Sequence, residues 1–290
     1  LYSVIPNTSA LDATVVRNTT ATYFNSSLIL VLAPANVLRI NYLTVGGEAF
    51  ILDEAQSTNL RNFSESIILS NGYAASNSTL TTVSVTNPAG VNSVNLFKLN
   101  VGANAGNSSD GFNFGGASLS NNTQHTQSLF VKGLGVNKLR LRSNITGAVL
   151  DFTLVGAGTV PNFAGGIQSA TIQALANGYY LISWTFTTTA TAPGNRMDYW
   201  TIKTDVADGS AGLYVYGAQF ELGSPTSYIP TLTSALVTRN ADVITVSPPA
   251  GTVKITTTFS NNTTQVITSI PALFTVPEGL IKQVLMQNSL

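Results

Sequence analysis

The sequence predicts an all-β protein: a jelly-roll β-sandwich with an N-terminal β region and a small C-terminal β extension. Apolar residues alternate with polar residues over short runs and do not recur at helical spacing. Clusters rich in Gly, Asn and Ser interrupt these runs about every ten residues, as in sandwiches and jelly rolls. No segment of roughly 20 to 50 residues repeats, which disfavours solenoids and propellers.

The N-terminal β region is expected at residues 1–60, as a region that attaches the protein. Extended segments are expected at Ala21–Phe24, Asn36–Tyr42 and Ile51–Leu60. The jelly roll is expected to follow at residues 61–232. Its clearest strands are predicted at Val94–Leu99, Ser128–Lys132, Lys138–Arg142, Val149–Leu154 and Tyr179–Phe186.

Two of these strands predict a core face through their alternation. In one, Leu150, Phe152 and Leu154 point the same way. In the other, the residues that share a face are Tyr180, Ile182, Trp184 and Phe186.

The end of the jelly roll is marked by a strand and a Pro-containing loop. In the strand, Leu213, Val215 and Gly217 alternate with Tyr214, Tyr216, Ala218 and Phe220. Gly223, Pro225 and Pro230 do not fit a central strand, so a surface loop is expected before extended structure resumes at Leu236–Val246.

Residues 233–290 are expected to form the C-terminal extension. Thr252–Phe259 and Gln265–Ile270 flank a polar turn and predict a β-hairpin, and a third strand is expected at Ile281–Met286. Because so few strands bury little apolar surface alone, the extension is expected to pack on the jelly roll or on neighbouring chains.

The composition limits the classes of partner. Charged residues make up only 9% of the chain and the formal net charge is zero, so a nucleic-acid partner is not expected. With 44% hydrophobic residues the chain can bury a sizeable core. The absence of cysteine excludes disulfides and thiolate metal sites. No signal segment or membrane anchor is expected, since no long apolar run occurs.

Catalytic constellations are not evident, so the chain is predicted not to be an enzyme and to need no cofactor. His125 is the only histidine, and its polar surroundings predict a solvated loop or edge position. Asp151 and Glu221 are acidic residues that could approach across a sheet, as glycoside cleavage requires. A partly buried carboxylate satisfied by arginine or by backbone N–H groups is the favoured interpretation of such residues.

A weak calcium hypothesis concerns Asp205 and Asp208, which lie on one loop and could supply oxygen ligands. Their spacing lacks the carboxylate density of a dedicated calcium loop. A solvated turn is therefore favoured, and no metal site is predicted.

Aromatic residues are the best candidates for ligand binding, because sugar rings stack on exposed Trp and Tyr. The first candidate set follows the Pro193-Gly194 turn, and Tyr214 and Tyr216 form the second. The alternative is that these rings pack in the core or between chains. The first set comprises Arg196, Asp198, Tyr199 and Trp200.

Motifs near both ends resemble those of virion proteins of tailed bacteriophages. GAQFELG at residues 217–223 is followed by SYIP at 227–230 and TRNAD at 238–242. These resemble the closing segment of jelly-roll modules in phage fibres and spikes, which are similar to carbohydrate-binding modules. Ile51–Leu60 resembles the I-E-x-x-R-T-N-L element of the same proteins, but Asp53 is inserted and Ser57 replaces the usual arginine.

The resemblance implies a non-enzymatic structural protein of a phage virion, as a tail fibre, spike or head fibre subunit that could aid host attachment. It implies a homotrimer that contacts other virion proteins and is assembled in the cytoplasm of a bacterial host. The alternative function is a lectin module that recognises host surface polysaccharides. A polysaccharide depolymerase is the minor alternative.

Overall fold

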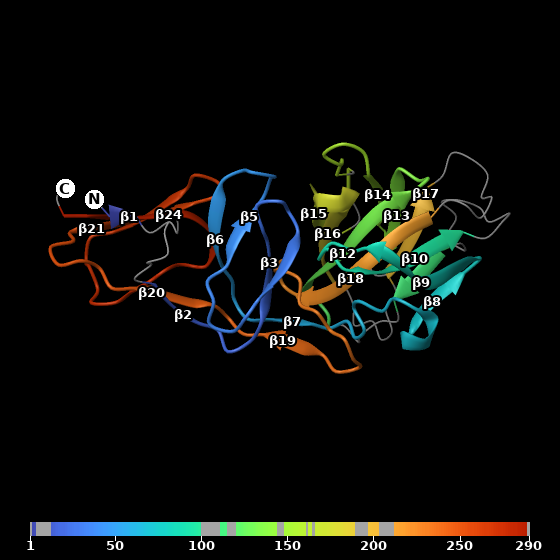
Figure 1. Cartoon of the computed structure of the whole chain (residues 1–290), viewed down its shortest axis with the longest axis horizontal. Helices are drawn as coiled ribbons and strands as arrows, with labels where there is room; N and C mark the ends of the chain where they lie inside the picture. Colours follow the sequence, from blue (N-terminus) through green and yellow to red (C-terminus); the bar gives the residue numbers. More distant parts are fainter. Residues whose placement is uncertain are drawn as a thin grey trace. The chain divides into compact units, whose positions relative to one another are not determined.

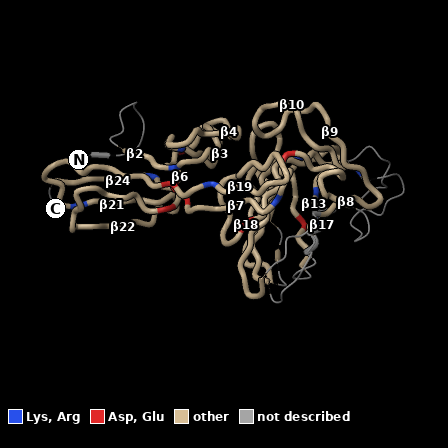
Figure 2. The backbone as a smooth tube through the Cα atoms, turned by 90° about the horizontal axis from the view of Figure 1, so that it is seen from below, with Lys and Arg blue, Asp and Glu red and all other residues tan. Residues whose placement is uncertain are grey.

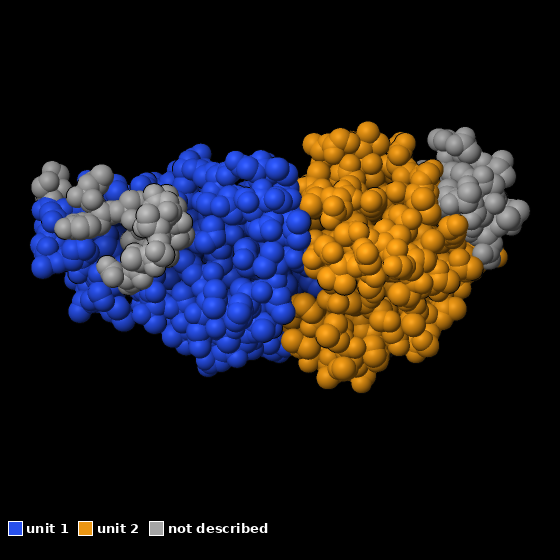
Figure 3. All heavy atoms as spheres, in the orientation of Figure 1, with its two compact units in different colours: residues 1–57, 226–228, 238–290 blue, residues 58–225, 229–237 orange. Residues whose placement is uncertain are grey.

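The computed structural model describes residues 2–3, 13–99, 111–114, 120–143, 148–160, 162–163, 166–188, 197–202 and 212–288. The chain forms two compact units (Figure 3). Unit 1 comprises Leu1–Ser57, Thr226–Tyr228 and Thr238–Leu290, whereas unit 2 comprises Thr58–Pro225 and Ile229–Val237.

Unit 2 is a β-sandwich, as the sequence predicts (Figure 1). Its described strands form two antiparallel sheets, which we call the β12 sheet and the β13 sheet. In spatial order, the β12 sheet contains β15 (Ile167–Ala174), β16 (Tyr180–Thr187), β12 (Gln124–Leu134), β18 (Gly212–Leu222), β10 (Asn92–Leu99) and β9 (Ser78–Thr86). The β13 sheet contains β14 (Val149–Thr153), β13 (Lys138–Ser143), β17 (Met197–Ile202), β11 (Gly111–Phe114) and β8 (Tyr73–Ser76). Single 3₁₀ turns occur at η1 (Leu69–Asn71) and η2 (Ala176–Gly178).

Both sheets of unit 2 contribute side chains to one hydrophobic core. Trp184 on β16 and Phe152 on β14 are fully buried in it, on the faces that the alternation predicts. Phe97 and Phe112 also lie in this core, with their ring centroids 4.8 Å apart. Burial of this apolar surface is the main force that holds the two sheets together.

The alternation predicted for β18 is wrong after Gly217. The register of β12 against β18 shifts between Ser128 and Phe130, where Gly217 adopts a φ of +63°. A β-bulge inserts one residue and reverses which side later residues face. Consequently Ala218 and Phe220 join Leu213 and Val215 in the core.

Unit 1 contains one six-stranded and two smaller antiparallel sheets in its described residues. The predicted C-terminal hairpin and third strand are present, and β6 pairs with β24 through Ile51 and Ile281, which joins the N-terminal and C-terminal segments. The first sheet contains β22 (Thr264–Ile267), β21 (Lys254–Phe259), β24 (Gly279–Gln287), β6 (Ala49–Asp53) and β5 (Ile40–Tyr42), with β1 (Tyr2–Ser3) beside β24. The others are β2 (Ala13–Val16) with β20 (Val243–Val246) and β23 (Phe274–Thr275), and β3 (Ala21–Phe24) with β4 (Leu30–Ala33).

Two short paired strands, β7 (Ser57–Asn59) and β19 (Val237–Arg239), contain points where the chain passes from one unit to the other. Charged residues are sparse along the backbone (Figure 2). Within the part of the chain that the structure describes, no helix has the length and apolar character needed to cross a membrane.

Candidate functional site

One face of the β12 sheet carries uncharged polar side chains on three neighbouring strands. The alternate residues of these strands, such as Leu129 and Trp184, point into the core. We call this outer surface the hydroxyl–amide face. It consists of Gln124, Thr126 and Ser128 on β12, Ser183, Thr185 and Thr187 on β16, and Gln168, Ser169, Thr171 and Gln173 on β15.

Hydrogen bonds between strands orient the hydroxyl–amide face. Thr126 Oγ1 lies 2.8 Å from Thr185 Oγ1, and Thr171 Oγ1 lies 2.6 Å from Ser183 Oγ. At the border, Gln124 Nε2 donates to Gln168 Oε1 at 2.6 Å. Thr126, Ser128, Ser183 and Thr185 are buried, at 0%, 7%, 5% and 4% exposed, whereas Gln124, Gln168, Ser169 and Thr171 are exposed. The centre of the face is therefore buried, and its accessible side chains lie on β15 and at the start of β12.

The chemistry of this face suits hydrogen bonding to sugars. Hydroxyl and amide groups can both donate and accept hydrogen bonds, as sugar hydroxyls do. None of the residues that define the face has an ionisable side chain, and the carboxylate beside it, Glu221 in register with Thr126, is fully buried.

A lysine and two tyrosines, which we call the Lys132 corner, lie further along the same sheet. Lys132 follows Ser128 and buried Phe130 on the outer side of β12. Its register partner on β18 is Tyr214, and both side chains are half-buried. Lys132 Nζ lies 5.6 Å from the ring centroid of Tyr179. Burial, followed by the proximity of Tyr214, raises the pKa of the fully buried Tyr179.

The predicted binding residues Tyr214 and Tyr216 differ in exposure. Tyr214 retains accessible surface beside Lys132. Tyr216 is 4% exposed, and its ring packs edge-on against Phe130 with centroids 6.0 Å apart. Burial is the main cause that raises its pKa, with Glu65 contributing. Little of the Tyr216 ring is therefore available for stacking.

The first candidate set belongs to the other sheet. Asp198, Tyr199 and Trp200 lie on β17, where Trp200 is in register with Arg140. Their strand is described by its backbone only. Arg196 and the calcium candidates Asp205 and Asp208 lie outside the described residues. Within the described residues, no group of three or more His, Asp or Glu side chains could hold a metal ion.

The prediction that His125 is solvated is wrong. It is 2% exposed, and its ring stacks between Phe186 and Phe220, with centroids 5.9 and 5.1 Å away. Nδ1 lies 3.0 Å from the carbonyl oxygen of Thr123. Burial lowers the pKa of the imidazole, the hydrogen bond opposing this in part. His125 is thus a core side chain, because its strand alternation outweighs its polar neighbours.

The two carboxylates considered for glycoside cleavage lie on strands of different sheets. Asp151 on β14 accepts from Arg140 Nε at 2.7 Å and from Nη2 at 2.8 Å. Glu221 on β18 is fully buried, and its Oε1 accepts from Gln219 Nε2 at 2.8 Å. Asp151 is therefore paired with arginine, as the favoured interpretation predicts.

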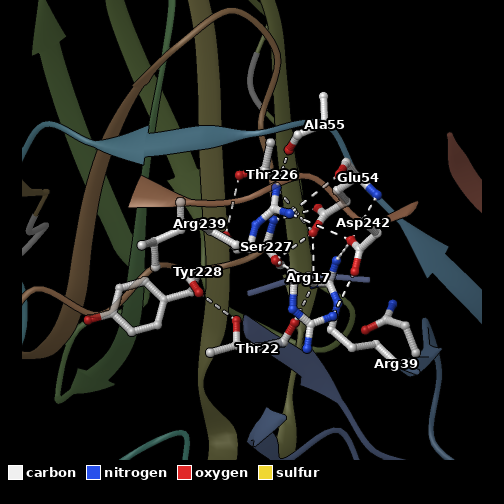
Figure 4. Close-up of polar contacts among 12 residues, drawn as sticks. Arg17, Thr22, Arg39, Glu54, Ala55, Thr226, Ser227, Tyr228, Arg239 and Asp242 are labelled. Atoms are coloured by element: carbon white, nitrogen blue, oxygen red, sulfur yellow. Dashed lines mark hydrogen bonds and ion pairs between the residues drawn. The ribbon is translucent and has the colours of Figure 1, made fainter. Parts of the chain in front are cut away.

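A buried ionic cluster in unit 1 gathers the motif residues Arg239 and Asp242 with Glu54 (Figure 4). Two further arginines complete it. Arg17 Nη1 lies 2.6 Å from Asp242 Oδ1, and Arg39 Nη1 lies 2.8 Å from Glu54 Oε2. The sequence contains these residues far apart, so only the resemblance of their motifs could have indicated that they meet.

The other motif residues also have structural contacts. Ser227 donates to Glu54 from its backbone N at 2.7 Å and from Oγ at 2.6 Å. In unit 2, Gln219 Oε1 accepts from the backbone N of Ile229 at 2.6 Å. Asn59 Nδ2 donates to the Ile229 oxygen at 2.9 Å. The motifs that carry the phage resemblance thus position backbone segments and leave the hydroxyl–amide face to other residues.

Comparison with known proteins gave structural matches only. Neither the protein-family models nor the curated protein sequences match this chain. One similar solved structure comprises the CBM22-1 and GH10 modules of endo-1,4-beta-D-xylanase 10B from Clostridium thermocellum, complexed with xylohexaose. It has 17% identity and a TM-score of 0.34, and the match covers 62% of this chain and 30% of that chain.

A second similar structure is the CBM22-1 xylan-binding domain of Xyn10C from Paenibacillus barcinonensis. It has 12% identity and a TM-score of 0.34. The match covers 59% of this chain and 94% of that domain.

Proposed function

We propose that the chain is a non-catalytic carbohydrate-binding protein, and that unit 2 binds a polysaccharide on the hydroxyl–amide face. The observation that carries this proposal is the composition of the face: its ten positions on three adjacent strands are all Ser, Thr or Gln, and the exposed ones lie on β15 and at the start of β12. Such side chains match the donors and acceptors of sugar hydroxyls.

The order of the face favours binding. Side chains that are already hydrogen-bonded to each other lose little rotamer freedom when a ligand arrives. The exposed Thr171 is held in this way by Ser183, and the exposed Gln124 and Gln168 hold each other. The half-buried ring of Tyr214 supplies an amphipathic surface further along the sheet.

Binding to an array of bacterial surface polysaccharides tests the proposal. Thr171→Glu places a negatively charged side chain on the face and is expected to weaken binding at least about tenfold, because a charge left unpaired under the ligand costs more than about 1.4 kcal/mol. Thr81→Glu is the matched control, since Thr81 is an exposed threonine on β9 of the same sheet. Equal affinity of both variants and the unaltered chain would contradict the proposed face.

A second proposal concerns the biological setting: the chain serves as a structural subunit of a tailed-phage virion, as a fibre or spike. It is supported by the GAQFELG, SYIP and TRNAD motifs, which resemble those of phage virion proteins. The proposal includes a homotrimer, contacts with other virion proteins and assembly in the bacterial cytoplasm. A stable monomer at micromolar concentration in light scattering, or the absence of the chain from purified virions by mass spectrometry, would refute it.

The proposed function includes no depolymerase activity. Asp151 and Glu221 are engaged by Arg140 and Gln219, and they belong to different sheets. Incubation with a bound polysaccharide is expected to leave its chain length unchanged in size-exclusion chromatography. Shortening of the polymer would show that the protein is an enzyme.

A further inference from the structure

Lys132 is the charged residue that lies nearest to the hydroxyl–amide face along β12. It stands four residues beyond Ser128 on the same side of the strand, about 14 Å away at the usual strand rise. Phe130 occupies the position between them and is fully buried. Because the outer side of β12 is buried at Ser128 and Phe130, a ligand on the face reaches Lys132 past the half-buried Gln173 on β15 and Leu181 on β16.

The lysine side chain is held by the turn that precedes β16. Asn177 and Gly178 both have left-handed backbone, with φ of 59° and 74°. A Cβ at Gly178 would lie 3.5 Å from Lys132 Cε, so the turn passes against the alkyl chain of the lysine. The ammonium nitrogen lies 5.6 Å from the centroid of the Tyr179 ring, which is a cation–π contact. Turn and ring together restrict where the charge can lie.

This held ammonium group has no carboxylate partner in the described part of the chain. None of the ion pairs between described residues includes Lys132. The side chain is half-buried and lies opposite half-buried Tyr214. An ammonium group with unused hydrogen-bond donors, next to a partly accessible aromatic ring, can bind an anionic group of a ligand.

We propose that Lys132 binds an anionic substituent, a carboxylate or a phosphate, of the polysaccharide that lies on the hydroxyl–amide face. This inference rests on the proposed carbohydrate-binding function and names its substrate class: an acidic polysaccharide. The hydroxyl–amide face binds the sugar rings of the polysaccharide. Tyr214 contacts the sugar that carries the anionic substituent, and Lys132 selects polysaccharides that carry this charge.

The test uses the full chain and acidic bacterial polysaccharides that it binds on an array. Each polysaccharide is compared with the same polymer after its carboxylates are reduced to alcohols or its phosphates are removed, which distinguishes the two sources of charge. The unaltered protein is expected to bind the acidic form about tenfold more tightly, as one charge-assisted hydrogen bond allows. Lys132→Met is expected to abolish this preference, and Lys132→Arg is expected to retain most of it.

Lys138→Met is the matched control, because it removes one positive charge from an exposed lysine of the β13 sheet. It is expected to keep the preference for the acidic polymer. Salt is expected to weaken binding of the unaltered protein more than binding of Lys132→Met. Melting curves of the variants separate lost binding from lost folding.

The outcomes distinguish the two proposals. If Thr171→Glu abolishes binding while Lys132→Met keeps the preference for the charged polymer, the hydroxyl–amide face is correct and the role of Lys132 is wrong. Equal binding of the charged and neutral polymers by the unaltered protein also refutes that role. Absence of binding to every polysaccharide refutes the proposed function and this inference with it.

Discussion

Asp242 accepts a hydrogen bond on Oδ1 from Nη1 of Arg17 at 2.6 Å, although 225 positions separate the two residues in the chain. Its other oxygen accepts from Arg39 Nη2 at 2.5 Å. Both arginines are fully buried. One carboxylate from the TRNAD motif therefore fixes two arginines of the N-terminal region within unit 1.

Asp242→Asn is expected to destabilise unit 1 strongly. The substitution leaves Arg17, Arg39 and Arg239 buried with Glu54 as the remaining carboxylate of the cluster. Breaking a buried ion pair in this way costs about 3–5 kcal/mol. Chemical denaturation followed by circular dichroism measures the loss.

The partly exposed pair of Arg140 and Asp151 provides the comparison for the ionic cluster. Asp151→Asn is expected to cost no more than about 1 kcal/mol, because solvent screens exposed pairs. A similar decrease in the free energy of unfolding for Asp242→Asn and Asp151→Asn would show that burial does not strengthen the ionic cluster.

Asp53 is expected to make unit 1 less stable at alkaline pH. It is 2% exposed, and neither carboxylate oxygen has a hydrogen-bond partner. Burial, with Asp242 and Glu278 next, raises its pKa from 3.8 to about 7, whereas Arg39 opposes this. The folded state thus holds a proton that the unfolded state releases, so stability falls as the pH rises from about 4 to about 7.

Asp53→Asn removes this titration. Its melting temperature is expected to exceed that of the unaltered chain at pH 8, and the difference is expected to shrink at pH 4. Calorimetry at the two pH values measures it. An equal difference at both would show that Asp53 is ionised in the folded state throughout.

His125 is expected to remain neutral in the folded protein below its ordinary pKa. Burial between Phe186 and Phe220 lowers its pKa from 6.5. The unfolded state binds the proton more readily, so unit 2 loses stability as the pH falls below about 6.5. Because the chain has one histidine, a single imidazole signal in an NMR titration reports the value. A midpoint at or above that of an unfolded peptide would contradict the stacked position.

Tyr179→Phe is expected to preserve or slightly raise stability. The Tyr179 hydroxyl is buried without a hydrogen-bond partner. Its removal is expected to abolish a desolvation penalty of about 1 kcal/mol or more in the free energy of folding. The ring that contacts Lys132 remains. Thermal unfolding and the preference for the charged polysaccharide are both measured. Tyr179→Ala, which removes the ring, is expected to lose stability, and equal behaviour of the two variants would exclude the ring contact.

Local pattern predicts the strands of unit 2 because each strand alternates about its own backbone. Leu150 and Phe152 on β14, and Ile182 and Trp184 on β16, are buried as their period of two indicates. The bulge at Gly217 breaks the same rule in β18. A glycine is compatible with the bulge but does not require it, so the reversal of faces is invisible without the pairing to β12.

The sequence by itself determines the all-β class, the alternating core faces and the low charge, since these depend on residues close together in the chain. Tertiary structure decides the burial of His125, the meeting of Arg17 with Asp242, and the hydroxyl–amide face. That face exists because β15, β16 and β12 are adjacent in this order. Strand order is set by the burial of apolar surface across the whole unit, and no short stretch of sequence contains that information.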